Sequence, residues 1–160
     1  MSLLAWKLVH SASMVLFLGN IITGVFWAAH ARRTRDLRVI AVTFDGLIRS
    51  DRWFTLPCVF LILLSGIALA GRARLPVLST GWLLWASVSF AVSGVLFGLR
   101  VGPLQRRIRD FATSAVAGAE DDWRTFSGMY SRWEVFGLLS IAAAVIPFAL
   151  MVLKPSLPGL

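Results

Sequence analysis

The sequence has only one cysteine, Cys58, so it can form neither an intramolecular disulfide nor a metal site built from several cysteines. The motifs of several common enzyme classes are also missing: there is no P-loop, no G-x-S-x-G, no H-E-x-x-H and no C-x-x-C. The sequence therefore carries no signature of a P-loop nucleotide hydrolase, a zinc protease or a dithiol redox enzyme. Cys58 lies in a hydrophobic run, where we expect a buried apolar role.

Acidic residues are scarce, with eight Asp and Glu against sixteen Lys and Arg, which gives a net charge of +8. Most of the basic residues lie in two segments between hydrophobic runs: Arg32, Arg33, Arg35, Arg38, Arg49 and Arg52 in one, and Arg100, Arg106, Arg107, Arg109, Arg124 and Arg132 in the other. The remaining basic residues are Lys7, Arg72, Arg74 and Lys154. By the positive-inside rule, this bias predicts that both segments are cytoplasmic and that both termini lie outside.

The same placement explains the positive charge without a nucleic-acid partner. We expect arginines next to the membrane to attract anionic lipid headgroups. The residues predicted to do so are Arg32, Arg33, Arg35, Arg106, Arg107 and Arg109.

Hydrophobic residues are abundant: they make up 58% of the chain, and the mean hydropathy is +0.77. Four runs, at about 3–29, 53–71, 81–101 and 133–153, reach the roughly 20 residues that a membrane-spanning helix needs. Because backbone groups in lipid must be paired within their own segment, we predict an all-α polytopic membrane protein with a four-helix bundle. We expect a single domain over 1–160, with cytoplasmic loops at 30–52 and 102–132.

Two short patterns occur twice. Residues 32–37 and 106–111 both read R-R-x-R-D followed by an apolar residue, and Arg52-Trp53 and Arg132-Trp133 each precede a later run. One interpretation is a duplicated hairpin, repeated in parallel about an axis along the membrane normal. The other is independent enrichment of basic residues and tryptophan at similar membrane depths.

The arginine-rich loops are predicted to be partly helical. Leu37, Ile40, Phe44 and Leu47 recur at helical spacing in the first loop, and Leu104, Ile108, Phe111 and Ala115 do so in the second. These segments either extend the spans into the cytoplasm or lie along the interface. Gly118 and the acidic residues at 120–122 predict a turn and a helix start before Trp123.

Polar residues line one side of the first run. On a helical wheel, His10, Ser13, Phe17, Asn20 and Gly24 fall within an arc of about 80°. We predict that this polar stripe faces the bundle interior, because a buried amide such as that of Asn20 usually finds a partner on another helix. An ionisable group inside the membrane is expensive, so His10 is a candidate functional residue.

His10 has several possible partners. It is a potential metal or haem ligand, and Met151 is the strongest axial-ligand type near the same end of the bundle. The residues at 65–70 and 82–89 are further neighbours at that depth. His10 can instead donate to a backbone carbonyl, such as that of Ala143, which Pro147 frees from the helix, or share a cofactor with His10 of a second subunit. His30 lies about 30 Å along the helix axis, too far to join it.

Other polar residues have simpler interpretations. We expect Asp51 to cap the start of the second span and Glu134 to pair with an arginine or a helix N-terminus. Gly94, Gly98 and Gly102 form a G-x-x-x-G-x-x-x-G series that permits close helix packing, within the bundle or across a homodimer.

The order of three motifs resembles a bacterial family of predicted four-helix integral membrane proteins of unknown function. These motifs are WKLVH at 6–10, DRWFTLP at 51–57 and LMVLKP at 150–155, with Gly66 late in the second span. More distantly, Lys7-Leu8-Val9-His10 is similar to the first helix of HemJ-type protoporphyrinogen oxidases, which are associated with haem b, and to CopD-like membrane proteins. The resemblance implies that His10 matches their first-helix histidine.

These observations lead to two functional hypotheses for a bacterial inner-membrane protein. In the first, the protein binds haem b and takes part in redox chemistry through His10, with Met151 or a second subunit opposite. In the second, it is a non-catalytic accessory or structural subunit of a membrane complex. Transport of small solutes or metals is disfavoured because the spans contain no acidic pair at mid-depth. The expected partners are the lipid bilayer and either a second copy or another membrane subunit.

Overall fold

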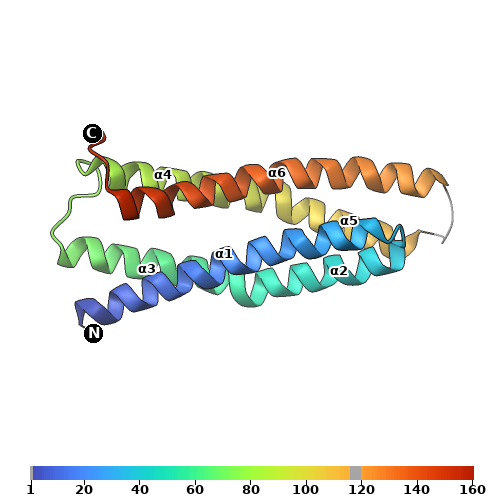
Figure 1. Cartoon of the computed structure of the whole chain (residues 1–160), viewed down its shortest axis with the longest axis horizontal. Helices are drawn as coiled ribbons and strands as arrows, with labels where there is room; N and C mark the ends of the chain where they lie inside the picture. The colour runs from blue at the N-terminus through green and yellow to red at the C-terminus, as the bar shows by residue number, and fades with distance from the viewer. Residues whose placement is uncertain (1, 116–119) are drawn as a thin grey trace.

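The computed structural model describes residues 2–115 and 120–160, and every regular element in these residues is helical (Figure 1). The elements in chain order are α1 (Leu3–Arg33), α2 (Leu37–Ser50), η1 (Asp51–Thr55), α3 (Leu56–Arg72), α4 (Gly81–Leu96), η2 (Phe97–Val101), α5 (Gly102–Ser114) and α6 (Glu120–Leu153). The two η elements are single π-helical turns that join α2 to α3 and α4 to α5 without a break. The described chain therefore forms four long helical rods: α1, α2–η1–α3, α4–η2–α5 and α6.

Each rod contains a helix long and apolar enough to cross a membrane: Leu3–Arg33, Leu37–Arg72, Gly81–Ser114 and Asp122–Leu153. These helices have 31 to 36 residues, which corresponds to about 47–54 Å at 1.5 Å per residue. A bilayer core is only about 30 Å thick, so every rod projects well beyond it. The predicted fold class, an all-α bundle with four membrane-spanning helices, is confirmed.

The segments predicted as loops at 30–52 and 102–132 are mostly helix in the described residues. They continue the rods in the same direction and do not fold back along the interface (Figure 1). The start of α6 at Glu120 agrees with the predicted helix start before Trp123. The turn predicted at Gly118 lies outside the described residues.

Exposed apolar side chains divide the bundle into two halves. Apart from Val39 and Val42 on α2, the large exposed apolar residues of the rods lie toward one end of the bundle. They extend to Trp27 on α1 and to Leu99 on the third rod, and they begin at Trp53 on the second rod and at Val135 on α6. We call 3–27, 53–72, 81–99 and 135–153 the apolar half, and 28–52, 100–115 and 120–134 the arginine-rich half. Only Val39 and Val42 are large, apolar and exposed in the described side chains of the arginine-rich half. The bilayer core therefore fits around the apolar half.

The larger of two hydrophobic cores lies in the arginine-rich half. Ile40, Phe44, Ile108 and Phe126 are fully buried there, and Trp133 closes this core toward the apolar half. Of the residues whose helical spacing predicted these helices, Ile40, Phe44 and Ile108 are buried in this core, whereas Phe111 and Ala115 are only partly buried. The smaller core contains Met14, Phe17, Cys58, Ile62 and Ala144, so the predicted buried role of Cys58 is confirmed.

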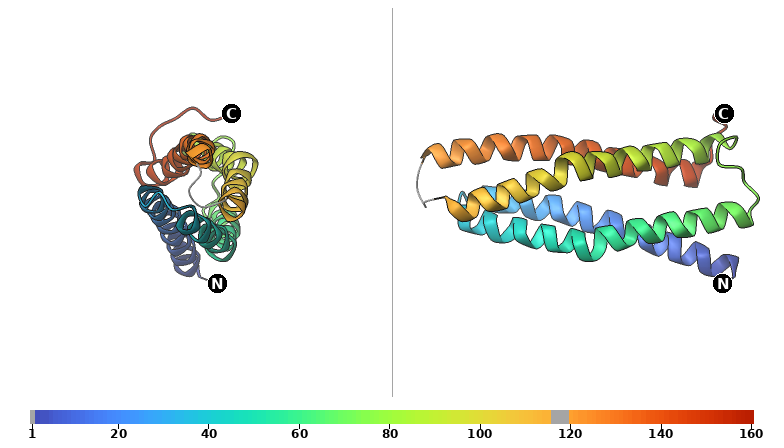
Figure 2. Two further views of the ribbon diagram at one scale, coloured as in Figure 1. Left: turned by 90° about the vertical axis from the view of Figure 1, so that its right-hand side faces the viewer. Right: turned by 180° about the vertical axis from the view of Figure 1, so that it is seen from behind.

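The rods pack mainly in pairs. In the apolar half α1 packs against α3 and α4 packs against α6, while in the arginine-rich half α2 packs against α5 (Figures 1 and 2). Both termini lie at the apolar end of the bundle (Figure 1). At that end the C-terminal tail crosses the start of α4, where the Leu160 N–H donates to the Leu78 carbonyl at 2.8 Å and Trp85 Nε1 donates to the Pro158 carbonyl at 3.2 Å.

The repeated sequence patterns occupy different local structures. The first R-R-x-R-D ends in a tight turn, where Arg35 has a φ of 53° and Asp36 caps α2 by accepting from the Arg38 N–H. The second lies inside α5. Likewise, Trp53 is 75% exposed whereas Trp133 is 3% exposed. Independent enrichment at similar depths accounts for these positions better than a duplicated hairpin does.

Candidate functional site

A cluster of polar side chains lies between three rods, at the border of the two halves. Its centre is Asp51, the first residue of the π-helical turn η1. The prediction that Asp51 caps the start of the second span is wrong, because α2, η1 and α3 form one continuous helix with no start at this point. A π-helical turn adds one residue per turn and commonly occurs at functional sites; here the Asp51 side chain lies inside the bundle.

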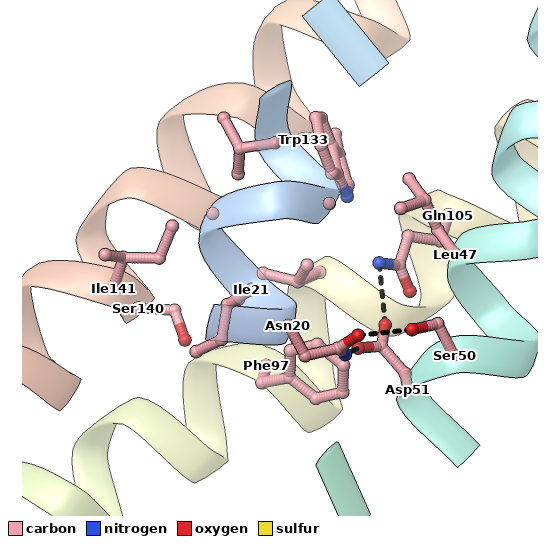
Figure 3. A pocket seen from close by; sticks show the side chains of 14 residues that line it. Asn20, Ile21, Leu47, Ser50, Asp51, Phe97, Gln105, Trp133, Ser140 and Ile141 are labelled. Atoms are coloured by element: carbon pink, nitrogen blue, oxygen red, sulfur yellow. Dashed lines mark hydrogen bonds between the residues drawn. The ribbon is translucent and has the colours of Figure 1, made fainter. Parts of the chain in front are cut away.

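Neighbouring side chains donate hydrogen bonds to both oxygens of Asp51 (Figure 3). Thr55 Oγ1 donates to Oδ1 at 2.8 Å, and Gln105 Nε2 donates to Oδ2 at 3.0 Å. Asn20 Nδ2 donates to Thr55 Oγ1 at 2.9 Å and to Asp51 Oδ1 at 3.4 Å, while the Ser50 hydroxyl donates to Asn20 Oδ1. We call these five residues, Asn20, Ser50, Asp51, Thr55 and Gln105, the Asp51 cluster.

The Asp51 carboxylate has hydrogen-bond donors but no cation beside it. Among the described residues, no Lys, Arg or His nitrogen lies within 4.0 Å of its oxygens. Its neighbour Arg49 pairs with Asp45 at 2.9 Å on the outside of α2. Removing a carboxylate from water without a paired cation costs several kcal/mol, which hydrogen bonds to the charged group offset only in part. A group kept at this cost is a candidate functional residue.

A small cavity of about 30 Å³ adjoins the Asp51 cluster inside the bundle (Figure 3). Phe97 and Val101 line it, and these residues begin and end the second π-helical turn, η2. Trp133 of α6 lines it as well and is 3% exposed. Among the described side chains, Trp133 Nε1 is the one buried nitrogen or oxygen atom without a hydrogen-bond partner. The unpaired N–H donor of Trp133 and the Asp51 carboxylate therefore belong to side chains that line the same cavity.

A larger groove of about 390 Å³ lies between α1 and α2 on the side of the bundle. Its lining includes Trp27, Thr43 and Gly46, and it shares Asn20, Gly24, Leu47 and Ser50 with the cavity. The Leu47 side chain lies directly over Gly24, since a Cβ at Gly24 would be 3.1 Å from Leu47 Cδ2. Only a few side chains therefore separate the buried cluster from the outer surface of the bundle.

The sequence predicted one member of the Asp51 cluster correctly, Asn20, whose amide does find partners on another rod. Ser50, Thr55, Gln105 and Trp133 were not identified. A signal for Gln105 was present: it precedes Ile108 and Ala112 by three and seven residues, which places it on the buried face of α5. Ser50, Thr55 and Trp133 gave no such signal, because their roles depend on contacts between different rods.

The rest of the polar stripe on α1 also faces inward, as predicted. Ser13 and Phe17 are buried, at 3% and 5% exposure, and His10, Asn20 and Gly24 are partly buried. His10 Nδ1 lies 2.9 Å from Ser65 Oγ on α3, and a Cβ at Gly66 would be 3.4 Å from His10 Cε1. The carbonyl of Ala143 instead accepts from Ser89 Oγ at 2.8 Å. Of the proposed neighbours, the residues at 65–70 therefore supply the hydrogen bond of His10.

The hydrogen bonds of Ser65 favour one tautomer of His10. Ser65 donates its single hydroxyl proton to the Leu61 carbonyl, so its oxygen is free to accept from the Nδ1–H of His10. In this tautomer Nε2 carries a lone pair, as a metal-ligating histidine requires. His10 by itself could supply one protein ligand to a haem iron. Among the described residues there is no group of three or more His, Cys, Asp or Glu side chains suited to a metal ion.

The other predicted ligand, Met151, lies in the last turn of α6, which packs against α4. Its pairing with His10 across a haem stays a prediction. His30 is exposed and stacks edge-on against Trp27, with ring centroids 5.8 Å apart, in agreement with an interfacial role. In the third rod, Gly94 on α4 and Gly98 in η2 are exposed, and an added Cβ at either would meet nothing within 4 Å, whereas Gly102 is buried.

The arginines predicted to contact lipid headgroups fall into two groups. Three make contacts within the bundle: Arg32 pairs with Glu134 at 3.8 Å and lies over the Tyr130 ring, Arg35 lies over Trp123, and Arg109 contacts Asp45 and Asp110. The other three, Arg33, Arg106 and Arg107, are exposed. The predicted pairing of Glu134 with an arginine is confirmed.

Comparison with known proteins places the chain in one family. No curated protein and no solved structure matches it. Residues 4–155, which include all four rods and both polar sites, match a family described as predicted integral membrane protein (DUF2269). The four-helix architecture and the resemblance drawn from the sequence motifs agree with that description. The chain therefore belongs to the DUF2269 family of integral membrane proteins.

Proposed function

We propose that the protein binds haem b in the membrane through Nε2 of His10 and takes part in electron transfer. The observation that carries this proposal is the hydrogen bond between His10 Nδ1 and Ser65, whose own proton goes to the Leu61 carbonyl. This arrangement orients the imidazole and leaves Nε2 available as a ligand, as hydrogen-bonded partners of ligating histidines do elsewhere. Gly66 supports the proposal because its missing side chain leaves room beside the ring.

The second axial position is open to two ligands. Met151 is one, because a His/Met pair is an established haem arrangement. The start of α1, which carries His10, and the end of α6, which carries Met151, lie at the same end of the bundle (Figure 1). His10 of a second copy is the other. Bound haem would supply one-electron chemistry, while the protein's part is to hold the iron through His10 and to keep its surroundings apolar.

We further propose that the arginine-rich half lies in the cytoplasm of a bacterial cell and that both termini lie on the outer side of the inner membrane. The distribution of basic residues supports this orientation. Reporter fusions test it. Alkaline phosphatase, active only outside the cytoplasm, should be active when fused after Leu160 and inactive when fused in the segment between α5 and α6. The opposite pattern would reverse the orientation.

The haem proposal is tested by the absorption spectrum of the protein purified from haem-replete cells. We expect a Soret band that is lost in His10→Ala and weakened in Ser65→Ala, because the second change removes only the group that orients the ring. His30→Ala is the matched control, since His30 is exposed and distant along the same helix; it should keep the band. A colourless wild-type protein that also fails to bind added hemin would refute the proposal.

A second candidate function is that of a non-catalytic subunit in a membrane complex, including a complex of identical copies. The exposed positions of Gly94 and Gly98 favour it, because small residues on a lipid-facing surface let another helix approach closely. Gly98→Ile should shift the protein to a smaller assembly in native gels or analytical ultracentrifugation. Val92→Ile, at an exposed position on α4 of the same rod, should not. Equal assembly sizes for all three proteins would exclude a partner at this surface.

A further inference from the structure

The unpaired N–H of Trp133 requires an explanation. An N–H group that is buried without a partner costs about 1–3 kcal/mol, and such groups are rare in native proteins. Trp133 is held in place on two sides, by Phe44 with ring centroids 5.2 Å apart and by Tyr130 at 5.5 Å. Its ring therefore cannot turn easily to find a partner within the protein. The N–H faces the cavity that also borders the Asp51 cluster (Figure 3).

The Asp51 carboxylate has unused capacity to accept a hydrogen bond. Each carboxylate oxygen can accept about two hydrogen bonds. Oδ1 accepts from Thr55 and, at a longer distance, from Asn20, whereas Oδ2 accepts only from Gln105. Oδ2 therefore has a lone pair left for a further donor or for a proton. Trp133 offers a donor and Asp51 offers an acceptor, so the group that fits between them must both accept and donate.

The cavity volume limits the size of that group. A buried water needs roughly 10–15 Å³ of such space, so a cavity of about 30 Å³ holds about two waters. Water accepts from an indole N–H and donates to a carboxylate, and buried waters of this kind usually have two to four polar partners. A metal cation fits poorly because the indole N–H would point its proton toward the ion.

Charged groups on the surrounding elements do not balance Asp51. In the described residues they are paired elsewhere or directed outward: Arg32 with Glu134, Arg49 with Asp45, Arg100 over the Phe136 ring, and Arg52, Arg106 and Arg132 exposed. Tyr130, whose ring packs against Trp133, lies under the Arg32 guanidinium. The charge on Asp51 can therefore be neutralised most directly by a proton.

We propose that water in this cavity joins the Trp133 N–H to Asp51, and that Asp51 takes up and releases a proton at this site. On uptake, a hydronium ion arriving from bulk water gives up a proton to Oδ2: one O–H bond of the hydronium breaks, an O–H bond forms on Asp51, and a neutral water remains that accepts from the acid; release is the reverse. The groove between α1 and α2 supplies the route to bulk water, with Leu47 over Gly24 as the barrier between groove and cavity. This role does not involve His10 and is independent of haem binding.

The indole N–H signals of the full-length protein, labelled with ¹⁵N-tryptophan in detergent micelles, test the proposal. The sequence has seven tryptophans, and Trp133→Phe assigns the signal of interest; if that variant does not fold, Phe variants of the other six assign it by elimination. We expect the Trp133 signal to show a cross-peak to water although the side chain is 3% exposed. Its chemical shift should follow a single titration step when the pH is varied, because the charge on Asp51 changes beside it.

Two pairs of variants separate the proposal from a general effect of mutation. The titration step should disappear in Asp51→Asn and persist in Asp45→Asn, because Asp45 pairs with arginines on the surface. Exchange of the Trp133 N–H with water should become at least several-fold faster in Leu47→Ala, which opens the barrier. Val39→Ala, which shortens an exposed side chain on α2 outside the lining of both the groove and the cavity, should leave exchange unchanged. A missing water cross-peak, or a titration step that survives Asp51→Asn, would overturn the proposal.

Discussion

Replacing Phe44 by alanine should destabilise the protein through the arginine-rich half. Phe44 is 0% exposed and packs edge-on against Trp133, with ring centroids 5.2 Å apart. In water-soluble proteins, truncating a buried phenylalanine to alanine lowers the unfolding free energy by about 3–5 kcal/mol. This range includes the roughly 1 kcal/mol that an aromatic pair contributes. We expect about 4 kcal/mol for Phe44→Ala, or nearly three powers of ten in the unfolding equilibrium.

Phe60→Ala is the matched control. Phe60 is 65% exposed on α3 in the apolar half, where lipid chains surround it. Because hydrocarbon surrounds this side chain in both the folded and the dissociated state, burial gives it little stabilisation. We expect a cost below about 1 kcal/mol for Phe60→Ala. Both variants remove the same side-chain atoms. The difference between their costs in unfolding free energy therefore measures how much more burial stabilises the arginine-rich half, which water surrounds, than the apolar half, which lipid surrounds.

Reversible unfolding in bicelles, followed by steric trapping, measures both free energies, and hydrogen exchange locates the effect. The amides of α2 and α5 should exchange faster in Phe44→Ala, because Phe44 lies on α2 and α2 packs against α5 in that core. The amides of α3 and α4 should change less, because neither helix contributes a buried residue to that core. Equal costs for the two variants, or unchanged exchange in α2, would refute the view that this half is held together by the hydrophobic effect in water.

Three further predictions concern other contacts. Ser93→Ala should lower the unfolding free energy by about 0.6–1.7 kcal/mol, the range for hydrogen bonds between membrane helices. The reason is that Ser93 on α4 and Ser140 on α6 each donate to the other's backbone carbonyl. Steric trapping measures the loss, and an unchanged stability would contradict the prediction. Arg109→Ala should lower the unfolding free energy by at most about 1 kcal/mol, and by less at high salt, because the 3.9 Å contact of Arg109 with Asp45 is partly exposed. Denaturant titrations measure this loss of stability, and a larger loss that does not depend on salt would contradict the prediction. Cys58, at 5% exposure, should react with a maleimide only after unfolding; fast labelling of the native protein would show that the smaller core opens readily.

Much of the fold could be predicted from local pattern alone. The hydrophobic runs determined four spanning helices, since a helix is the way a single segment pairs its backbone groups in lipid. The helical spacing of Ile40 and Phe44, and of Leu104 and Ile108, predicted the helices α2 and α5. The arc through His10, Ser13 and Asn20 gave the inward face of α1 correctly, because a helix repeats every 3.6 residues wherever it lies.

The candidate sites were less predictable because they combine residues from different rods. His10 was recognised as unusual, but its partner Ser65 was one of several residues at the right depth. Asp51 was assigned to a cap because it precedes an apolar run, and the pattern does not reveal that the helix continues through a π-helical turn. Gln105 and Trp133 are separated from Asp51 by 54 and 82 residues, so only the packing of the rods brings them to one cavity.

By itself, the sequence determined the environment and the elements: an integral membrane protein of four helices, with its arginines collected on one side. The hydrophobicity and charge of each residue are properties of that residue alone, so one sequence is enough to predict the membrane spans and the side that carries the arginines. The tertiary structure alone decided that the helices continue as a second, water-exposed bundle, and that Asp51, Gln105 and Trp133 meet where the two halves join. Those contacts depend on how each helix is rotated about its axis, and packing against the other three sets that rotation.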